Sequence, residues 1–294
     1  MEARILQYLV RHPDSTLTEI RDIGATPRHL ERLEGEGFLR QAERQVERDP
    51  LAGYDFEPRE RPMLSAEQQA AADAAWTGGV TLLHGVTGSG KTEVYLELVE
   101  RALAEGGSAI VLVPEIALTP QAIRRYGERF ASTLTVLHSQ LSTGELFDQW
   151  FRVQRGDARL IVGSRSAVFA PAQDLKLIVL DEEHEWSYKQ ADPQPRYHAR
   201  AAAEKLAALT GARVVLGSAT PDLVTYHRSE LGSIRRAELH GRIAPAEDGS
   251  VTEGSLPTVS IVDMREELHE GNRSVFSRPL KRALIQSLRA GEQS

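Results

Sequence analysis

Cysteine is missing from this sequence, and so is any long apolar run. None of the 294 residues is cysteine, which excludes disulfide bonds and thiolate metal sites. No run of eighteen apolar residues occurs, so we expect no helix that spans a membrane. The first residues, MEARILQYLVRHPD, carry charges through their apolar part and lack a small-residue cleavage site, unlike a signal peptide. These absences favour a cytoplasmic protein.

An excess of basic residues is also absent. The formal net charge is -7, with 42 acidic against 35 basic side chains. Any contact with nucleic acid must therefore come from a local basic surface and not from the field of the whole chain. The residues that are present, 41% hydrophobic and 26% charged, have globular proportions. The length allows a large α/β core and a smaller module.

A glycine-rich turn follows the apolar stretch from Val80 to Leu83. Its sequence, GVTGSGKT, runs from Gly85 to Thr92 and fits the pattern G-x-x-x-x-G-K-[ST] of phosphate-binding loops. Glycines let such a backbone fold around phosphate, and the loop amides and the next helix's N-terminus point at phosphate oxygens. In this pattern Lys91 reaches the β and γ phosphates, and Thr92 holds Mg²⁺ through its hydroxyl.

Gln68 lies just upstream of this loop and has two interpretations. The sequence LSAEQ, from Leu64, opens a predicted helix with Ser65 as N-cap and Gln68 at the third helical position, which is a capping box. An amide side chain also both donates and accepts hydrogen bonds, as an adenine edge requires. The sequence leaves both roles open.

Beyond the loop, strands and helices alternate in the rhythm of a parallel sheet. The chemically distinctive segments all follow predicted strands, and parallel α/β sheets bind ligands at the carboxyl ends of their strands. We therefore predict an α/β fold with a central parallel sheet, whose further strands cover residues 109–113, 134–138, 160–162, 177–180 and 214–216.

An acidic pair follows the apolar stretch LIVL. Asp181 is placed to orient Mg²⁺ through its water shell, and Glu182 to activate an attacking water. Acidic residues after a buried strand can also form a solvated loop, but the phosphate loop upstream favours the catalytic interpretation. His184 is either a structural hydrogen-bonding residue or a link from this pair to Ser218 and Thr220.

Residues 1–49 are predicted to form a small helical module with the pattern of a winged helix-turn-helix. A third helix starts at Thr26-Pro27, and the charged residues after Phe38 could form a strand or wing. Acids outnumber bases in this module, which favours fork binding, packing or partner docking over base reading through Arg28, His29 and Arg32. Residues 50–62, rich in proline, glycine and charge, are predicted to be a linker.

Six segments, in this order, resemble the motifs of the PriA family (primosomal protein N′), replication-restart DNA helicases of superfamily 2. They are GVTGSGKTEVYL, VPEIALTPQ, HS, GSRSAVFAP, LDEEHEWSYKQADPQPRYHAR and GSATP. The resemblance covers roughly residues 64–294 and implies a RecA-like motor lobe over 63–294. It also implies a DNA-dependent ATPase that moves 3′ to 5′ at forked or single-stranded DNA, works with primosome proteins and single-strand-binding protein, and acts in the cytoplasm at the nucleoid.

The resemblance assigns roles by motif. Catalysis falls to Lys91, Asp181 and Glu182, and Mg²⁺ to Thr92 and Asp181. ATP binding falls to Gln68, Gly85, Val86, Thr87, Gly88, Ser89, Gly90, Lys91 and Thr92. Coupling of hydrolysis to DNA falls to His184, Gly217, Ser218, Ala219 and Thr220. Contacts with DNA fall to Thr119, Ser164, Arg165, Ser166, Trp186, Tyr188, Lys189, Arg196, Tyr197 and Arg200, where hydroxyls and cations suit phosphates and rings suit stacked bases.

The sequence departs from this family in three places. It has no counterpart of the family's N-terminal 3′-end-binding domain, of its second motor lobe, or of its cysteine-ligated zinc module. We therefore expect a fragment that binds ATP and DNA but does not unwind DNA alone. Two other hypotheses remain open: a non-catalytic platform that binds forks and recruits primosome proteins, and another superfamily 2 DNA translocase.

Overall fold

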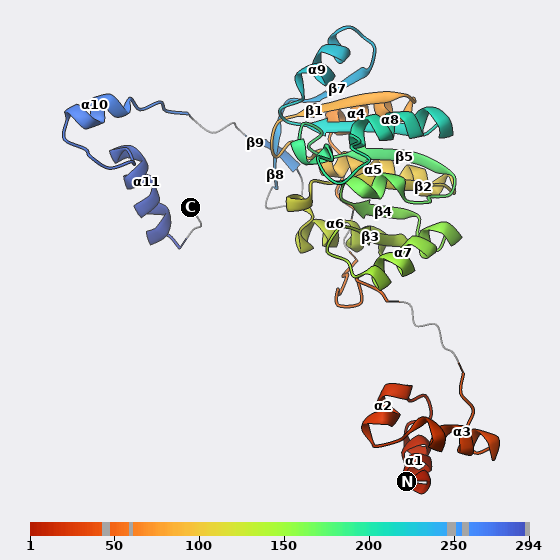
Figure 1. The fold of residues 1–294 in the computed structure, drawn as a ribbon. Coiled ribbons are helices and arrows are strands. Elements are labelled where there is room, and N and C mark those ends of the chain that lie inside the picture. The colour runs from red at the N-terminus through yellow and green to blue at the C-terminus, as the bar shows by residue number, and fades with distance from the viewer. Residues whose placement is uncertain (43–47, 59–60, 246–250, 255–258, 292–294) are drawn as a thin grey trace. The chain divides into compact units, whose positions relative to one another are not determined.

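The computed structural model describes residues 1–42, 48–58, 61–245, 251–254 and 259–291 (Figure 1). The chain divides into two compact units, Met1–Asp49 and Pro50–Ser294. The first unit has one buried apolar cluster and the second has two, one on each face of its sheet. Each unit is described by itself below.

The described residues of the first unit form three short helices, α1 (Glu2–Arg11), α2 (Leu17–Asp22) and α3 (Pro27–Gly35). A capping box between Thr16 and Glu19 begins α2. The apolar core is small and contains Ile5, Ile20, Ala25, Leu30 and Leu33. Residues 38–42 form no strand, and residues 43–47, where the rest of the predicted wing falls, lie outside the described part of the chain.

The second unit is built on a seven-stranded sheet in the order β3-β4-β2-β5-β6-β1-β7, and every pair of neighbours is parallel. The predicted parallel α/β fold is therefore confirmed. Predicted strand ends differ from the observed ones by at most two residues. The observed strands are β1 (Val80–Gly85), β2 (Ser108–Leu112), β3 (Leu134–Leu137), β4 (Leu160–Gly163), β5 (Leu175–Leu180), β6 (Arg213–Ser218) and β7 (Arg235–Leu239).

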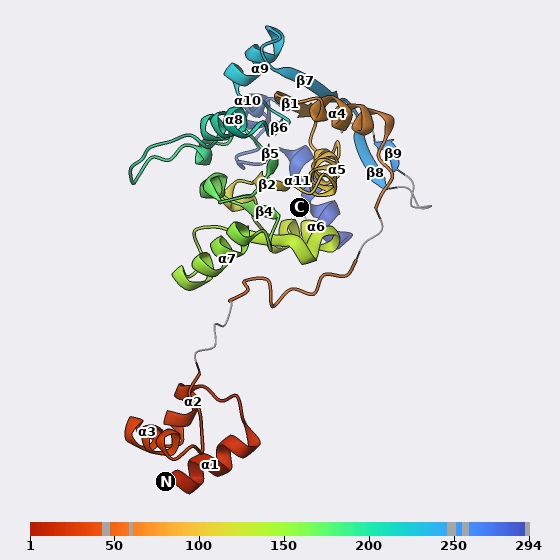
Figure 2. The same cartoon turned by 90° about the vertical axis from the view of Figure 1, so that its right-hand side faces the viewer.

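Helices cover both faces of this sheet, as Figure 2 shows. Strand side chains alternate between the faces, so Leu82 packs into one cluster and Leu83 into the other. One face packs against α4 (Ala66–Trp76), α5 (Lys91–Ala104) and α6 (Pro120–Phe130). The other face packs against α7 (Thr143–Arg155) and α8 (Ala199–Thr210), and α9 (Leu223–Glu230) lies near β1.

The segment expected to be a linker packs onto the second unit. Leu51 is buried in the apolar cluster on the sheet face that α4, α5 and α6 cover, and Tyr54 and Phe56 pack against this cluster. The ring of Phe56 lies where a side chain on Gly127 of α6 would be, and Arg61 pairs with Glu97 of α5. The described part of residues 50–62 is therefore docked onto helices and is not a free linker. Its few apolar side chains pack against the second unit, although its overall composition is typical of a loop.

Two strands and two helices follow the sheet. β8 (Arg242–Pro245) pairs antiparallel with β9 (Val251–Gly254). α10 (Met264–His269) and α11 (Arg278–Arg289) come next, and α11 buries none of its side chains. The described part of the unit also contains the 3-10 turns η1 (Glu115–Ala117), η2 (Ala131–Thr133), η3 (Arg165–Phe169) and η4 (Trp186–Tyr188). Among the described residues, no helix is both long and apolar enough to cross a membrane.

Candidate active site

The predicted phosphate loop joins β1 to α5 at the carboxyl edge of the sheet. Gly88 and Gly90 have φ of +83° and +79°, a region that favours glycine. A Cβ on Gly85 would lie 2.6 Å from Ser89 Oγ, so the turn needs glycine there as well. Lys91 Nζ donates to the carbonyl of Gly85 at 2.9 Å, which holds the ammonium group across the loop.

Two further features fit a phosphate ligand at this loop. The hydroxyl of Ser89 is buried and has no hydrogen-bond partner among the residues that the structure describes. Gly90 must also be glycine, because a Cβ there would overlap the Gln68 amide and the Ile243 side chain, which already lie against the loop. A loop of this shape offers amide donors and one cation to an anion.

Gln68 makes the capping contacts predicted for it and also contacts the loop. Its Oε1 accepts from the backbone N–H of Ser65 at 2.9 Å. Its Nε2 lies 3.4 Å from the carbonyls of both Ser89 and Gly90. With 2% of its surface exposed, Gln68 connects the start of α4 to the phosphate loop. The contact with adenine remains a prediction.

Asp181 directly follows β5 and faces the loop. Its Oδ1 accepts a hydrogen bond from the hydroxyl of Tyr95 at 2.9 Å. Burial raises the pKa of Asp181, although the Tyr95 hydrogen bond and the positive charge of Lys91 oppose this shift. Tyr95 was not identified from the sequence, because its position on the apolar face of α5 gives no sign of an aspartate partner 86 residues away.

Glu182 has an unusual backbone conformation. Its φ is +46°, in the left-handed region that non-glycine residues rarely adopt. Its N–H donates to Asp181 Oδ1 at 3.1 Å, which holds the tight turn after β5. Such backbone strain, about 1–3 kcal/mol, persists where surrounding contacts fix it, and it gathers at functional sites.

The donor types at this edge fit a magnesium ion. A carboxylate and a hydroxyl, here from Asp181 and Thr92, are oxygen ligands, and Mg²⁺ in phosphate sites keeps several waters beside one or two protein ligands. Within the described ranges, no group of three or more histidine, cysteine, aspartate or glutamate residues could hold a metal by itself. A site that takes its remaining ligands from water and phosphate agrees with this arrangement.

The side chain of His184 forms a hydrogen bond with Ser218, the last residue of β6. His184 Nδ1 lies 2.7 Å from Ser218 Oγ, and the N–H of Thr220 donates to the same oxygen at 3.0 Å. Glu182 Oε2 lies 3.7 Å from His184 Nδ1. A Cβ on Gly217 would collide with the Tyr95 hydroxyl, so position 217, two residues before Ala219, must be glycine. The coupling role of these residues remains a prediction.

Most residues expected to contact DNA lie at the surface near the same edge. Trp186 is 81% exposed, and Thr119, Ser166, Lys189 and Arg196 are also exposed. Tyr197 and Arg165 are partly exposed, whereas Ser164 is buried. Rings and cations that alternate on a surface suit stacking on bases and contact with phosphates.

Arg165 is already engaged by the protein. Its Nη1 donates to the carbonyls of Ser187 and Lys189 at 2.8 Å and 3.2 Å, and its guanidinium lies 5.8 Å from the centre of the Tyr197 ring. In this conformation Arg165 therefore shapes the aromatic segment from Trp186 to His198. Its contact with DNA remains a prediction.

Tyr188 and Arg200 differ from their predicted role. Tyr188 is 1% exposed, and its hydroxyl donates to the carbonyls of Leu112 and Asp181. Arg200 is turned inward and pairs with Glu183 and Asp222. We assign both residues to internal contacts and not to the DNA-facing surface, because each would have to break these bonds to reach a strand. The sequence pattern did not distinguish inward from outward positions within one short segment.

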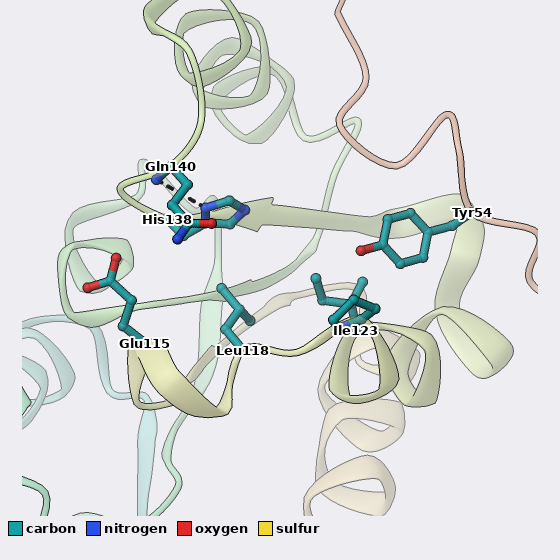
Figure 3. A pocket seen from close by; sticks show the side chains of 7 residues that line it. Tyr54, Glu115, Leu118, Ile123, His138 and Gln140 are labelled. Atoms are coloured by element: carbon teal, nitrogen blue, oxygen red, sulfur yellow. Dashed lines mark hydrogen bonds between the residues drawn. The ribbon is translucent and has the colours of Figure 1, made fainter.

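A pocket lies beside the predicted DNA segment that follows β2 (Figure 3). The volume of the pocket is about 250 Å³, and both Glu115 and His138 line it. Burial lowers the pKa of His138. A carboxylate and a neutral imidazole do not suit a phosphate, so we assign no DNA contact to this pocket. Its lining residues are Tyr54, Glu115, Leu118, Pro120, Ile123, His138 and Gln140.

Comparisons with known proteins match the part of the chain that contains this site. The sequence model of the DEAD/DEAH box helicase family matches residues 65–228, more than half of the chain. The replication restart protein PriA of Bacillus subtilis is 43% identical over 300 residues, which cover 99% of this chain and 36% of that protein. PriA of Synechocystis is 48% identical over 207 residues, which cover 69% of this chain and 24% of that protein.

A solved structure, the DUF1998 helicase MrfA bound to DNA and AMPPNP, aligns with a TM-score of 0.46 at 19% identity, covering 64% of this chain and 32% of that one. The chain spans about a third of the Bacillus relative's length. The sequence similarity confirms the resemblance to PriA that the motifs predicted. On the strength of the matched residues 65–228, which contain the phosphate loop, the D-E-E-H turn and the G-S-A-T segment, the chain belongs to the DEAD/DEAH box helicase family.

Proposed function

We propose that residues 63–294 form an ATP-binding motor lobe of a PriA-type replication-restart helicase, and that residues 1–49 are a separate winged-helix-like module. The observation that carries this proposal is the meeting of the phosphate loop with Asp181 at one edge of the sheet, where the charge of Lys91 acts on the carboxylate. ATP-dependent unwinding of DNA from 3′ to 5′ is proposed for the whole protein and not for this chain, because the chain spans only about a third of the length of the Bacillus subtilis relative.

The proposed chemistry divides among a few side chains. Loop amides and Lys91 bind the β and γ phosphates, and Tyr95 holds the Asp181 carboxylate toward the loop through its 2.9 Å hydrogen bond. Mg²⁺, held by Thr92 and Asp181, would neutralise charge on the phosphates. Glu182 would accept a proton from the attacking water. The hydrogen bond between His184 and Ser218 would transmit a change in the position of the D-E-E-H turn to the end of β6.

The proposed partner is single-stranded or forked DNA, bound at the surface that carries Trp186, Lys189 and Arg196. Their exposure supports this surface, since stacking on bases requires an accessible ring. Primosome proteins and single-strand-binding protein are proposed as partners of the whole protein. Its location would be the cytoplasm, at the nucleoid.

The proposal is tested by two titrations of this chain. Fluorescent ATP is titrated with and without Mg²⁺, and a labelled single-stranded oligonucleotide is titrated separately. We expect saturable binding of both, with tighter nucleotide binding when Mg²⁺ is present. Failure to bind nucleotide under either condition would overturn the proposed site. ATPase rates with and without forked DNA, compared with those of a protein that includes a second motor lobe, test the assignment of unwinding to the whole protein.

A further inference from the structure

Glu183 is a buried carboxylate to which the proposed chemistry gives no role. It is the third residue of the D-E-E-H turn, and its side chain has 0% exposure. Oε1 accepts from the N–H of Asp222 at 2.7 Å. Oε2 accepts from Arg200 Nη1 at 2.9 Å and from Thr225 Oγ1 at 3.0 Å. The carboxylate is therefore fully engaged by one cation and two neutral donors.

The partners of Glu183 come from three segments that lie apart in the sequence. Glu183 itself follows β5, and its own N–H donates to the carbonyl of Gly217 in β6 at 3.0 Å. Arg200 is in the first turn of α8, directly after the aromatic segment. Asp222 caps α9, which follows the G-S-A-T segment, and Thr225 lies in its first turn. One carboxylate thus fastens the starts of α8 and α9 to the turn beside Asp181.

The aromatic segment is anchored at both of its ends by this region. At one end, Tyr188 donates to the carbonyl of Asp181 at 2.7 Å. At the other end, Arg200 bonds to Glu183. A bridge between Lys189 and His198 closes the segment between these anchors. A displacement of the D-E-E-H turn would therefore move both ends of the segment that presents Trp186.

The cost of breaking the contacts of Glu183 favours movement of the D-E-E-H turn, the start of α8 and the start of α9 as one unit. A buried carboxylate left without its arginine is costly, because the charge has lost both water and its partner. Asp222 is more exposed but shares the same arginine: hydrogen bonding and charge from Arg200 outweigh the effect of burial and lower the pKa of Asp222 overall. The group therefore resists opening, and a shift at one segment is passed to the other two.

We propose that Glu183 is a positioning residue that couples the nucleotide site to the aromatic DNA-binding segment by joining the D-E-E-H turn, the start of α8 and the start of α9. This inference rests on the proposed function, since it requires that the chain bind both nucleotide and DNA. Glu183 contacts neither ligand. It acts through the positions of Asp181 and Trp186.

A second ion pair provides a matched control. Arg228 donates to both carboxylate oxygens of Glu204 at 2.8 Å and 2.9 Å, and this pair also joins α8 to α9. Among the residues that the structure describes, neither Arg228 nor Glu204 forms a hydrogen bond or ion pair with the D-E-E-H turn. If simple attachment of α8 to α9 were sufficient, the two pairs would have equivalent effects.

The test measures coupling on the full 294-residue chain. The affinity for a labelled single-stranded oligonucleotide is measured with and without saturating Mg²⁺ and a non-hydrolysable ATP analogue, and the ratio of the two affinities is the coupling. Couplings of this kind are typically about 5- to 150-fold. We expect Glu183→Gln to bring the ratio to within about twofold of one. The DNA affinity measured without nucleotide should stay within about threefold of wild type, so the change falls on the affinity measured with the nucleotide analogue. Glu204→Gln should keep the wild-type ratio.

The possible outcomes separate this inference from the proposed function. A wild-type chain that binds neither ligand contradicts the proposed function. A chain that binds both but has a ratio of one, or a Glu183→Gln chain that keeps the wild-type ratio, contradicts the coupling role alone. Equal losses of both affinities with an unchanged ratio also contradict it, because a purely structural role would produce them. If Glu183→Gln does not fold, Thr225→Val removes one donor at nearly constant shape and should still lower the ratio.

Discussion

Lys91 is the residue on which nucleotide binding depends most directly. Its ammonium group now bonds to the carbonyl of Gly85, a contact that a phosphate would replace. We predict that Lys91→Ala weakens nucleotide binding by about 10- to 100-fold, the effect of losing a charge-assisted hydrogen bond of about 1.5–3 kcal/mol. Calorimetric titration with a nucleotide measures the change. Lys205→Ala, which removes an exposed lysine from α8, is the control and should bind as wild type.

Glu182 should separate binding from turnover. Glu182→Gln keeps the size and backbone of the side chain but removes the proton acceptor, so we predict unchanged nucleotide affinity. Turnover by an enzyme that includes a second motor lobe should fall by about 10²- to 10⁴-fold, the usual contribution of a general base. Steady-state ATPase rates in the presence of DNA provide the measurement. A Glu182→Gln enzyme with wild-type turnover would remove Glu182 from the catalytic role.

Sequence patterns identify residues whose role depends on nearby neighbours in the chain. The phosphate loop and Asp181 each follow a recognisable strand, so their meeting follows from the parallel sheet. Tyr95 and Glu183 were missed because their partners are far away in sequence: Tyr95 bonds across 86 positions, and Glu183 meets Arg200, Asp222 and Thr225 only after three elements have packed. Such pairs have no local signature.

At the scale of elements, apolar strands were predictable and a charged one was not. β7, with the sequence RRAEL, lies at the edge of the sheet and buries only Ala237 and Leu239, so it lacks the continuous apolar run of the inner strands. The docked segment 50–58 was also missed. Proline, glycine and charge suggested a loop, and the contact of Phe56 with Gly127 joins two positions that lie 71 residues apart in the sequence.

The docked segment yields a prediction about local stability. Phe56→Ala should release it from α6, since the ring occupies the space beside Gly127. We expect a loss of about 1–2 kcal/mol in the free energy of unfolding, because the ring is only partly buried, together with faster proteolysis within residues 50–58. Limited proteolysis with mass spectrometry and thermal unfolding measure the two effects.

Asp55→Ala is the matched control for this segment, because the neighbouring side chain is exposed. It should change neither the cleavage rate nor the melting temperature. Gly127→Leu should reproduce the effect of Phe56→Ala from the other side of the contact. Slow cleavage in both Phe56→Ala and Gly127→Leu would mean that Leu51, Tyr54 and Arg61 hold the segment without the contact of Phe56.

At the scale of the whole chain, the two compact units have separate cores. Leu33, which is 1% exposed in the first unit, can therefore be removed without touching the sheet. We predict that Leu33→Ala destabilises the first unit by about 2–5 kcal/mol and leaves the nucleotide affinity of the second unit unchanged. Hydrogen exchange resolved by peptide, alongside nucleotide titration, measures both. Faster exchange spread evenly through the sheet would contradict the independence of the units.

The position of β7 has a consequence for how copies of this protein behave toward each other. An edge strand has one row of backbone N–H and C=O groups that no neighbouring strand satisfies, and such rows invite another strand to add itself. In β7 the exposed side chains include Arg235, Arg236 and Glu238, and Arg236 pairs with Glu238 at 3.2 Å. A strand that approached this edge would have to strip water from these charges. The same charges that made β7 hard to predict from the sequence therefore disfavour edge-to-edge pairing between copies of the protein.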